Sequence, residues 1–210
     1  MNFLQKIGLL FLSAAIFAQP AEAHPHVWVT YTLKAVSGKQ GLSRIDFTWR
    51  FDAMFSEMAL EAAGLKKVSA GDSKTLEEKA FSNLKNYHYY TYITADGVEF
   101  KPETVHNFSA EMKGKNLVYH FSIALPKPAK KLEIAIWDDE FYVDLDPPTE
   151  EVPNDKAGSF MSERKFAAKP FVGAESENGA KPPACTQREK DHVSEIWGKF
   201  ITYIVECQAN

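Results

Sequence analysis

Cysteine is scarce in this chain, which has two among 210 residues, Cys185 and Cys207. Their separation excludes a C-x-x-C redox motif. If the chain is exported, two cysteines are expected to form one disulfide, and the loop that it closes is worth about 3 kcal/mol in the chain-entropy treatment. Paired thiolate ligands for a metal ion are the alternative.

The short motifs of several enzyme classes are also absent. There is no Gly-rich phosphate loop, no G-x-S-x-G elbow and no H-E-x-x-H helix. Cys–His catalysis needs a free thiol, which a disulfide removes. The formal net charge is −4, and no basic run of the kind that follows a phosphate backbone occurs. We therefore predict a protein that is not an enzyme and does not bind nucleic acid.

Long apolar runs are missing except near the start, at residues 7–18. That run is shorter than the roughly 20 residues that span a bilayer. It follows Lys6 and precedes an A-x-A sequence that ends at Ala23, an order typical of a secretory signal peptide over residues 1–23. We expect cleavage after Ala23, which leaves residues 24–210 as a single exported domain with no membrane-spanning segment.

Alternating apolar residues predict strands over much of the remaining chain. The segments 27–36 and 42–51 alternate and are rich in β-branched and aromatic residues, so they predict an antiparallel hairpin. Strand patterns return over residues 87–146, with a turn at Asp96-Gly97. Their regular spacing predicts a β-sandwich. Residues 147–184 are rich in Pro, Gly and Ser and predict long loops with an occasional strand.

Helical periodicity appears in three places. We expect one helix over residues 52–64, with Asp52 as its N-cap and Gly64 as its stop, and a second helix over 73–87. The amphipathic pattern of 188–200 predicts a C-terminal helix. The expected fold class is therefore α+β, mainly antiparallel β and sandwich-like, with an inserted helical pair and a C-terminal helix.

Cleavage after Ala23 would give the mature chain a His24-Pro25-His26 terminus. A terminal histidine offers its α-amino nitrogen and its imidazole as two donors, and one further imidazole completes an N₃ set that suits Cu(II) or Ni(II). Pro25 has no N–H, which excludes the square-planar geometry that uses the amide of the second residue. The alternative is a polar terminus with two incidental histidines.

Further ligands would come from other segments. His88 lies in an aromatic run, where a histidine commonly makes a hydrogen bond in the core. Asp52 and Asp138 lie beside strand ends, where carboxylates are often simply solvated. The candidate metal ligands are therefore His24 and His26, with His88 and Asp138 or Asp52 as partners, and no residue is predicted to be catalytic.

Four segments resemble the DUF1007 family of periplasmic proteins. They are "HPHVWV", "WRFDAMFS", "YHYYTYITADG" and "IWDDEFYVDL". Ala53 stands where the family has an acid, and Trp137 and Asp139 replace a tyrosine and a proline. The positions that match the family pattern are His24, Pro25, His26, Trp28, Trp49, Asp52, Ser56, His88, Tyr89, Tyr90, Thr91, Asp138 and Tyr142.

The resemblance implies a role in handling a divalent transition metal. Family members are described as periplasmic components of an ABC-type transport system, and their genes tend to lie beside nickel/cobalt transporters. The ion would be Ni, Co, Zn or Cu, and the partner an inner-membrane metal transporter. Many relatives carry an acidic, calcium-loop-like insert between the helices, but this chain has only "SAGDSK" there. No calcium site is therefore expected.

Two other functions remain open at this point. Copper-dependent polysaccharide oxygenases are exported β-sandwiches whose mature chains also begin with histidine, which suggests a histidine-brace oxidative enzyme. The other is a metal-free module that docks on a transporter, with incidental histidines.

Overall fold

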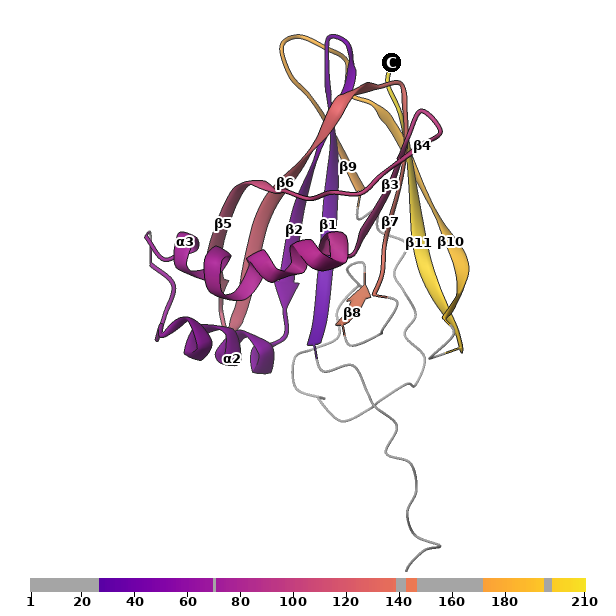
Figure 1. The fold of residues 1–210 in the computed structure, drawn as a ribbon. Helices are drawn as coiled ribbons and strands as arrows, with labels where there is room; N and C mark the ends of the chain where they lie inside the picture. Colours follow the sequence, from indigo (N-terminus) through magenta and orange to yellow (C-terminus); the bar gives the residue numbers. More distant parts are fainter. Residues whose placement is uncertain (1–26, 70, 139–142, 147–171, 195–197) are drawn as a thin grey trace, which may run out of the picture.

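Two β-sheets make up most of the computed structural model, which describes residues 27–69, 71–138, 143–146, 172–194 and 198–210 (Figure 1). The first sheet has the strand order β5-β6-β2-β1-β8, and β9 also pairs with β1. Its strands are β1 (Val27–Gly38), β2 (Gly41–Phe51), β5 (His106–Lys113), β6 (Asn116–Ala129), β8 (Val143–Asp146) and β9 (Val172–Ser176).

The second sheet has the order β10-β11-β7-β3-β4. Its strands are β3 (Thr91–Ala95), β4 (Val98–Phe100), β7 (Lys131–Ile136), β10 (Ala184–Ser194) and β11 (Gly198–Gln208). Every pairing is antiparallel except those of β1 with β8 and with β9. The predicted sandwich-like, mainly antiparallel architecture is thus confirmed.

One buried hydrophobic cluster joins the two sheets and the helical segments. The alternation predicted for 42–51 holds, since Ile45, Phe47 and Trp49 are at most 2% exposed. Phe81, which lies in the second helical segment, is fully buried among aromatic rings of several elements. Burial of one such side chain contributes about 1.5–3 kcal/mol. The rings that surround Phe81 at centroid distances of 4.8–6.0 Å belong to Trp49, Tyr89, Phe108, Tyr119 and Phe121.

The inserted helical pair is confirmed. Helix α2 (Ala53–Ala63) begins after Asp52, whose side chain accepts a hydrogen bond from the Phe55 N–H. It ends at Gly64, which adopts φ +74°, a left-handed conformation that glycine reaches without steric cost. The second segment is less regular than predicted: α3 (Ser73–Leu76) continues into a π-helical turn, η1 (Glu77–Phe81), and a 3₁₀ segment, η2 (Ser82–Tyr90).

The predicted C-terminal helix over 188–200 is wrong. Most of this segment belongs to β10, which pairs antiparallel with β11 from Ala184↔Gln208 to Ser194↔Gly198. Val193, which belongs to the apolar stripe of that helical pattern, is 72% exposed. Long-range pairing with β11 overrides the local helical pattern, and the charged residues of β10 suit an edge strand, where they oppose pairing with another chain.

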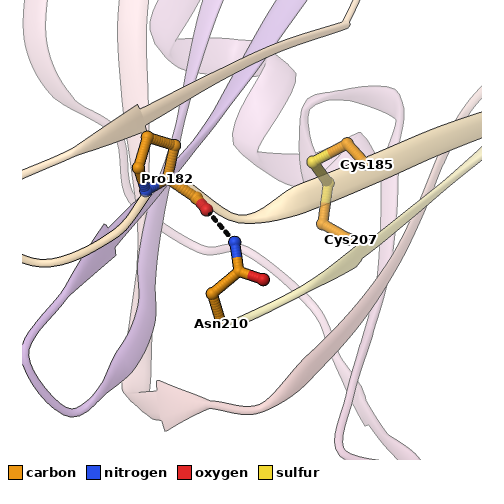
Figure 2. Close-up of a disulfide and its surroundings, with 4 residues drawn as sticks. All are labelled: Pro182, Cys185, Cys207 and Asn210. Atoms are coloured by element: carbon orange, nitrogen blue, oxygen red, sulfur yellow. Dashed lines mark hydrogen bonds between the residues drawn. A yellow bond between two sulfur atoms is a disulfide. The ribbon is translucent and has the colours of Figure 1, made fainter.

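The predicted disulfide is present between Cys185 and Cys207, which are direct cross-strand partners of β10 and β11 (Figure 2). Nearby, the Asn210 side-chain amide donates a hydrogen bond to the Pro182 carbonyl. A structural disulfide is typical of compartments outside the reducing cytoplasm, in agreement with the expected location. In the part of the chain that the structure describes, no helix is long and apolar enough to cross a membrane. The expected signal peptide lies outside the described residues.

Candidate metal site at the start of strand β1

The five predicted metal ligands divide into two groups. His24 and His26 lie outside the described residues. Asp52, His88 and Asp138 are described, and the two aspartates contact the backbone at the beginning of β1 or of its partner β8. Figure 1 shows β8 beside the first residues of β1.

Asp52 connects the start of β1 to the start of α2. Its Oδ2 accepts a hydrogen bond from the Trp28 N–H at 3.1 Å, and its Oδ1 accepts one from the Phe55 N–H at 2.8 Å. Its own N–H donates to the Trp28 carbonyl at 3.0 Å. This placement follows from the sheet register, because Phe51 pairs with Val29 and the next residue therefore lies beside Trp28. Asp52 is thus bonded to Trp28, which follows His26 by two residues in the sequence.

Asp138 contacts strand β8, which lies beside β1 on the side opposite β2. It lies two residues after β7 and is only 5% exposed. Its Oδ2 accepts a hydrogen bond from the Val143 N–H at 3.0 Å. Val143 pairs with Val27, the first residue of β1, in the parallel β1–β8 ladder. Both predicted carboxylates therefore bind the backbone within one ladder position of the start of β1.

His88 lies in a strained turn. His88, Tyr89 and Tyr90 have φ values of +52°, +52° and +51°, so three consecutive residues other than glycine are left-handed. Each such residue costs about 1–2 kcal/mol. The turn is held from both sides, since the Thr91 hydroxyl donates to the Tyr89 carbonyl at 2.8 Å and the Trp137 N–H donates to the Tyr90 carbonyl at 3.1 Å. The second bond ties the turn to the segment that carries Asp138.

The Nδ1 atom of His88 is buried and has no hydrogen-bond partner among the described residues. Buried polar atoms are nearly always paired, and an imidazole nitrogen is a common metal ligand when neutral. Functional sites often keep backbone strain at a cost in stability. Here the strain occurs at the residue whose buried Nδ1 has no partner among the described residues. No sequence signal marks the strain, because residues other than glycine seldom adopt this conformation and local patterns do not forecast it.

Two tyrosines close to Asp146 have raised phenol pKa values. Burial, followed by the negative charge of Asp146 on β8, raises the pKa of Tyr31 above its usual value. Burial, with the charges of Glu189 and Asp146, also raises the pKa of Tyr203 to about 12. Both phenols therefore stay protonated at neutral pH, and histidines and carboxylates remain as donors at this end of the sandwich.

The described residues do not complete a site by themselves. Among them, no group of three or more His, Cys, Asp or Glu side chains is arranged to hold a metal ion. Asp52 and Asp138 lie at the start of β1 and of β8, and the turn that carries His88 is bonded to Trp137, the residue before Asp138. Any site there would take further donors from His24 and His26.

The other described histidines have different surroundings. The ring of His120 lies between Thr48 Oγ1, 3.0 Å from Nδ1, and Glu111 Oε1, 3.1 Å from Nε2. The ring of His192 packs on Trp137 at a centroid distance of 4.7 Å. These residues do not join Asp52 or Asp138 in a ligand group.

The fold and this end of the sandwich define a two-sheet, disulfide-linked β protein with an inserted helical pair. The chain belongs to the family described as "Protein of unknown function (DUF1007)", whose pattern matches residues 9–169. No curated protein matches the sequence. A solved structure of AChBP from Bulinus truncatus aligns with 99% of this chain and 98% of its own, at 8% identity and a TM-score of 0.33. A similarity at this TM-score supports no inference about function.

Proposed function

We propose that this protein binds a divalent transition-metal ion, Ni, Co, Zn or Cu, in the periplasm and passes it to or from an inner-membrane transporter. One observation supports the proposal above all. The Asp52 and Asp138 side chains both bind the backbone at the first residues of β1 and of its partner β8. The first residues of β1 directly follow His24-Pro25-His26 in the sequence.

The proposed ligand set is rich in nitrogen. His24 would contribute its amine and imidazole after signal cleavage, and His26 a second imidazole. His88 would contribute its buried Nδ1, which has no partner among the described residues. An ionised carboxylate offers about four acceptor positions, and Asp52 or Asp138 would contribute a carboxylate oxygen to the set. Such a mixture of imidazole and carboxylate suits borderline transition metals better than Ca²⁺ or Mg²⁺.

Two measurements test the proposal. Native mass spectrometry of protein purified from the periplasm gives the cleavage site and the bound metal together, and we expect a mature chain that begins at His24 with one transition-metal ion. Calorimetric titration then compares this chain with one that carries an added glycine before His24. Loss of the terminal chelate should weaken binding by at least about tenfold. Equal affinity of the two chains would contradict the amine ligand.

His88→Asn separates a ligand role from a structural one. Asparagine is enriched in the left-handed region, so the substitution should leave the unfolding free energy unchanged or raise it. Metal affinity should fall, because the imidazole donor is lost. His106→Asn is the matched control, since His106 is exposed on β5 and lies outside this set. Unchanged metal affinity in His88→Asn would remove His88 from the proposed ligands.

A further inference from the structure

A separate polar pocket of about 510 Å³ lies on the outer face of the first sheet, further along β1 than the candidate metal site. We call it the outer pocket. It is lined by residues of β1, β2, β5, β6 and β9. Its size falls within the range of small-molecule binding sites, which run from about 300 to 1,000 Å³.

The floor of the outer pocket consists of two cross-strand rows of polar side chains. In one row, Lys34 pairs with Asp46, and Asp46 pairs with Ser122. In the other row, Thr32 pairs with Thr48, and Thr48 pairs with His120. Side chains two residues apart on a strand share a face, so both rows point away from the core. The residues between them point inward and are at most 3% exposed: Leu33, Phe47 and Phe121.

A β-bulge adds one more polar group to the outer pocket. The register of β5 against β6 shifts between His106 and Ser109, and Asn107 within the shift has φ +55°. The Asn107 Nδ2 atom lies 3.5 Å from the Ser122 Oγ atom, while Phe108 packs inward on Phe81. Bulges of this kind re-aim a side chain and are common beside binding sites. Here the bulge directs an amide onto the pocket lining.

Gly173 keeps the β9 side of the outer pocket open. It pairs with Lys34. A Cβ at this position would lie 3.3 Å from the Lys34 Cγ atom. The glycine therefore lets the lysine stem lie close against β9, and an added Cβ would require that stem to shift by a few tenths of an ångström.

The charges in the outer pocket are already compensated by neighbours. The Lys34 ammonium lies 2.6 Å from the Glu175 carboxylate, and the Arg44 Nε atom lies 2.8 Å from the Asp46 carboxylate. An ionic ligand would thus meet no unbalanced charge. The remaining groups are hydroxyls and an amide, which both donate and accept hydrogen bonds. Both ring nitrogens of His120 already have partners. Ligand hydroxyls have the same dual character.

We propose that the outer pocket binds a neutral, polyhydroxylated molecule of mono- or disaccharide size. Its lining offers paired donors and acceptors, no uncompensated charge and few apolar side chains. The proposal is independent of metal binding, because none of the candidate metal ligands lines this pocket.

An NMR titration of the mature protein tests the outer pocket directly. The probes are D-glucose, maltose and N-acetyl-D-glucosamine at millimolar concentrations, with citrate and spermidine as charged comparisons. We expect at least one sugar to shift the backbone amide signals of Thr32, Thr48 and His120, and the charged probes to leave them unchanged. The proposal is overturned if no sugar shifts these signals, or if only a charged probe does.

Matched variants then assign the binding to the lining. Asn107→Gly keeps the left-handed backbone and removes the amide, so binding of the sugar that responds should weaken by about tenfold, the loss of roughly one hydrogen bond. Asn178→Gly is its control, because Asn178 is exposed and also left-handed, at φ +56°, but does not line the outer pocket. Thr32→Val should weaken binding similarly, with Thr30→Val as its control. Wild-type affinity in both lining variants would overturn the proposal.

Discussion

Asp52 illustrates how one side chain can connect two elements at a possible site. One carboxylate oxygen caps α2 through the Phe55 N–H, and the other accepts the Trp28 N–H of β1. The capping half of this role was predictable from the sequence, because an aspartate directly precedes a helical pattern. The Trp28 contact was not, because it depends on the register of β1 against β2.

Asp52→Ala should lower the unfolding free energy by about 2 kcal/mol, since it removes a helix cap and leaves a part-buried backbone N–H unpaired. Urea denaturation measures the change. Asp72→Ala is the control, because Asp72 accepts only an exposed turn hydrogen bond from the Ser69 N–H, and a loss of about 0.5 kcal/mol or less is expected. Equal losses in the two variants would show that Asp52 does not join the two elements.

Tyr119 carries a buried hydroxyl with no hydrogen-bond partner among the described residues. A phenol without a partner costs free energy when it is buried. Tyr119→Phe should therefore leave the unfolding free energy unchanged or raise it by up to about 1 kcal/mol. Equilibrium unfolding in urea at neutral pH measures this effect. A loss of more than about 1 kcal/mol would indicate a partner for the hydroxyl.

The same residue predicts a response to alkaline pH. Burial raises the pKa of Tyr119 above its unfolded value, which is about 10. Its neutral form is thus favoured by folding, and this contribution is present below about pH 10 and lost as the pH rises toward the folded pKa. Tyr119→Phe should reduce the fall in stability above about pH 10. Tyr87→Phe, at a side chain that is 48% exposed, should leave the fall unchanged.

At the scale of elements, the local sequence pattern predicts some strands and helices correctly, but long-range strand pairing overrides it in one segment. The strands of the β1–β2 hairpin and helix α2 follow from alternation and capping, which are local signals. The segment over 188–200 shows helical spacing, yet β10 forms there because β11 offers eleven paired positions and a covalent link. Amphipathic spacing cannot report a partner strand that follows later in the chain.

Removal of the disulfide tests how far the covalent link supports this hairpin. Cys185 and Cys207 are 22 residues apart, and a loop of that length is worth about 3 kcal/mol of unfolding free energy. The Cys185→Ala, Cys207→Ala double variant should lose about that amount in urea denaturation. Reductant should destabilise the wild-type chain similarly and leave the double variant unaffected. A wild-type midpoint that does not respond to complete reduction would contradict this estimate.

At the scale of the whole molecule, the sandwich was predictable and the assembly of its candidate site only partly so. Short, regularly spaced strands indicate the architecture. The proximity of Asp138 to the start of β1 depends on a parallel pairing between Val27 and Val143, which are far apart in sequence, whereas that of Asp52 depends on the register of β1 against β2. The chemistry of the ligands is readable from residue types, whereas their convergence follows from topology.

If a metal ion binds where these elements meet, it should stabilise the whole fold. A ligand at about 100 times its Kd raises the unfolding free energy by about 2.7 kcal/mol, so added Ni²⁺, Co²⁺, Zn²⁺ or Cu²⁺ should raise the Tm of the chain that begins at His24. An imidazole must be neutral to bind a metal ion, and model-peptide histidine is protonated below about pH 6.5. The rise should therefore be full near about pH 7.5, vanish near about pH 5 and reverse on addition of a chelator. A chain with a residue added before His24 should show a much smaller rise, and an equal rise at both pH values would contradict histidine ligation.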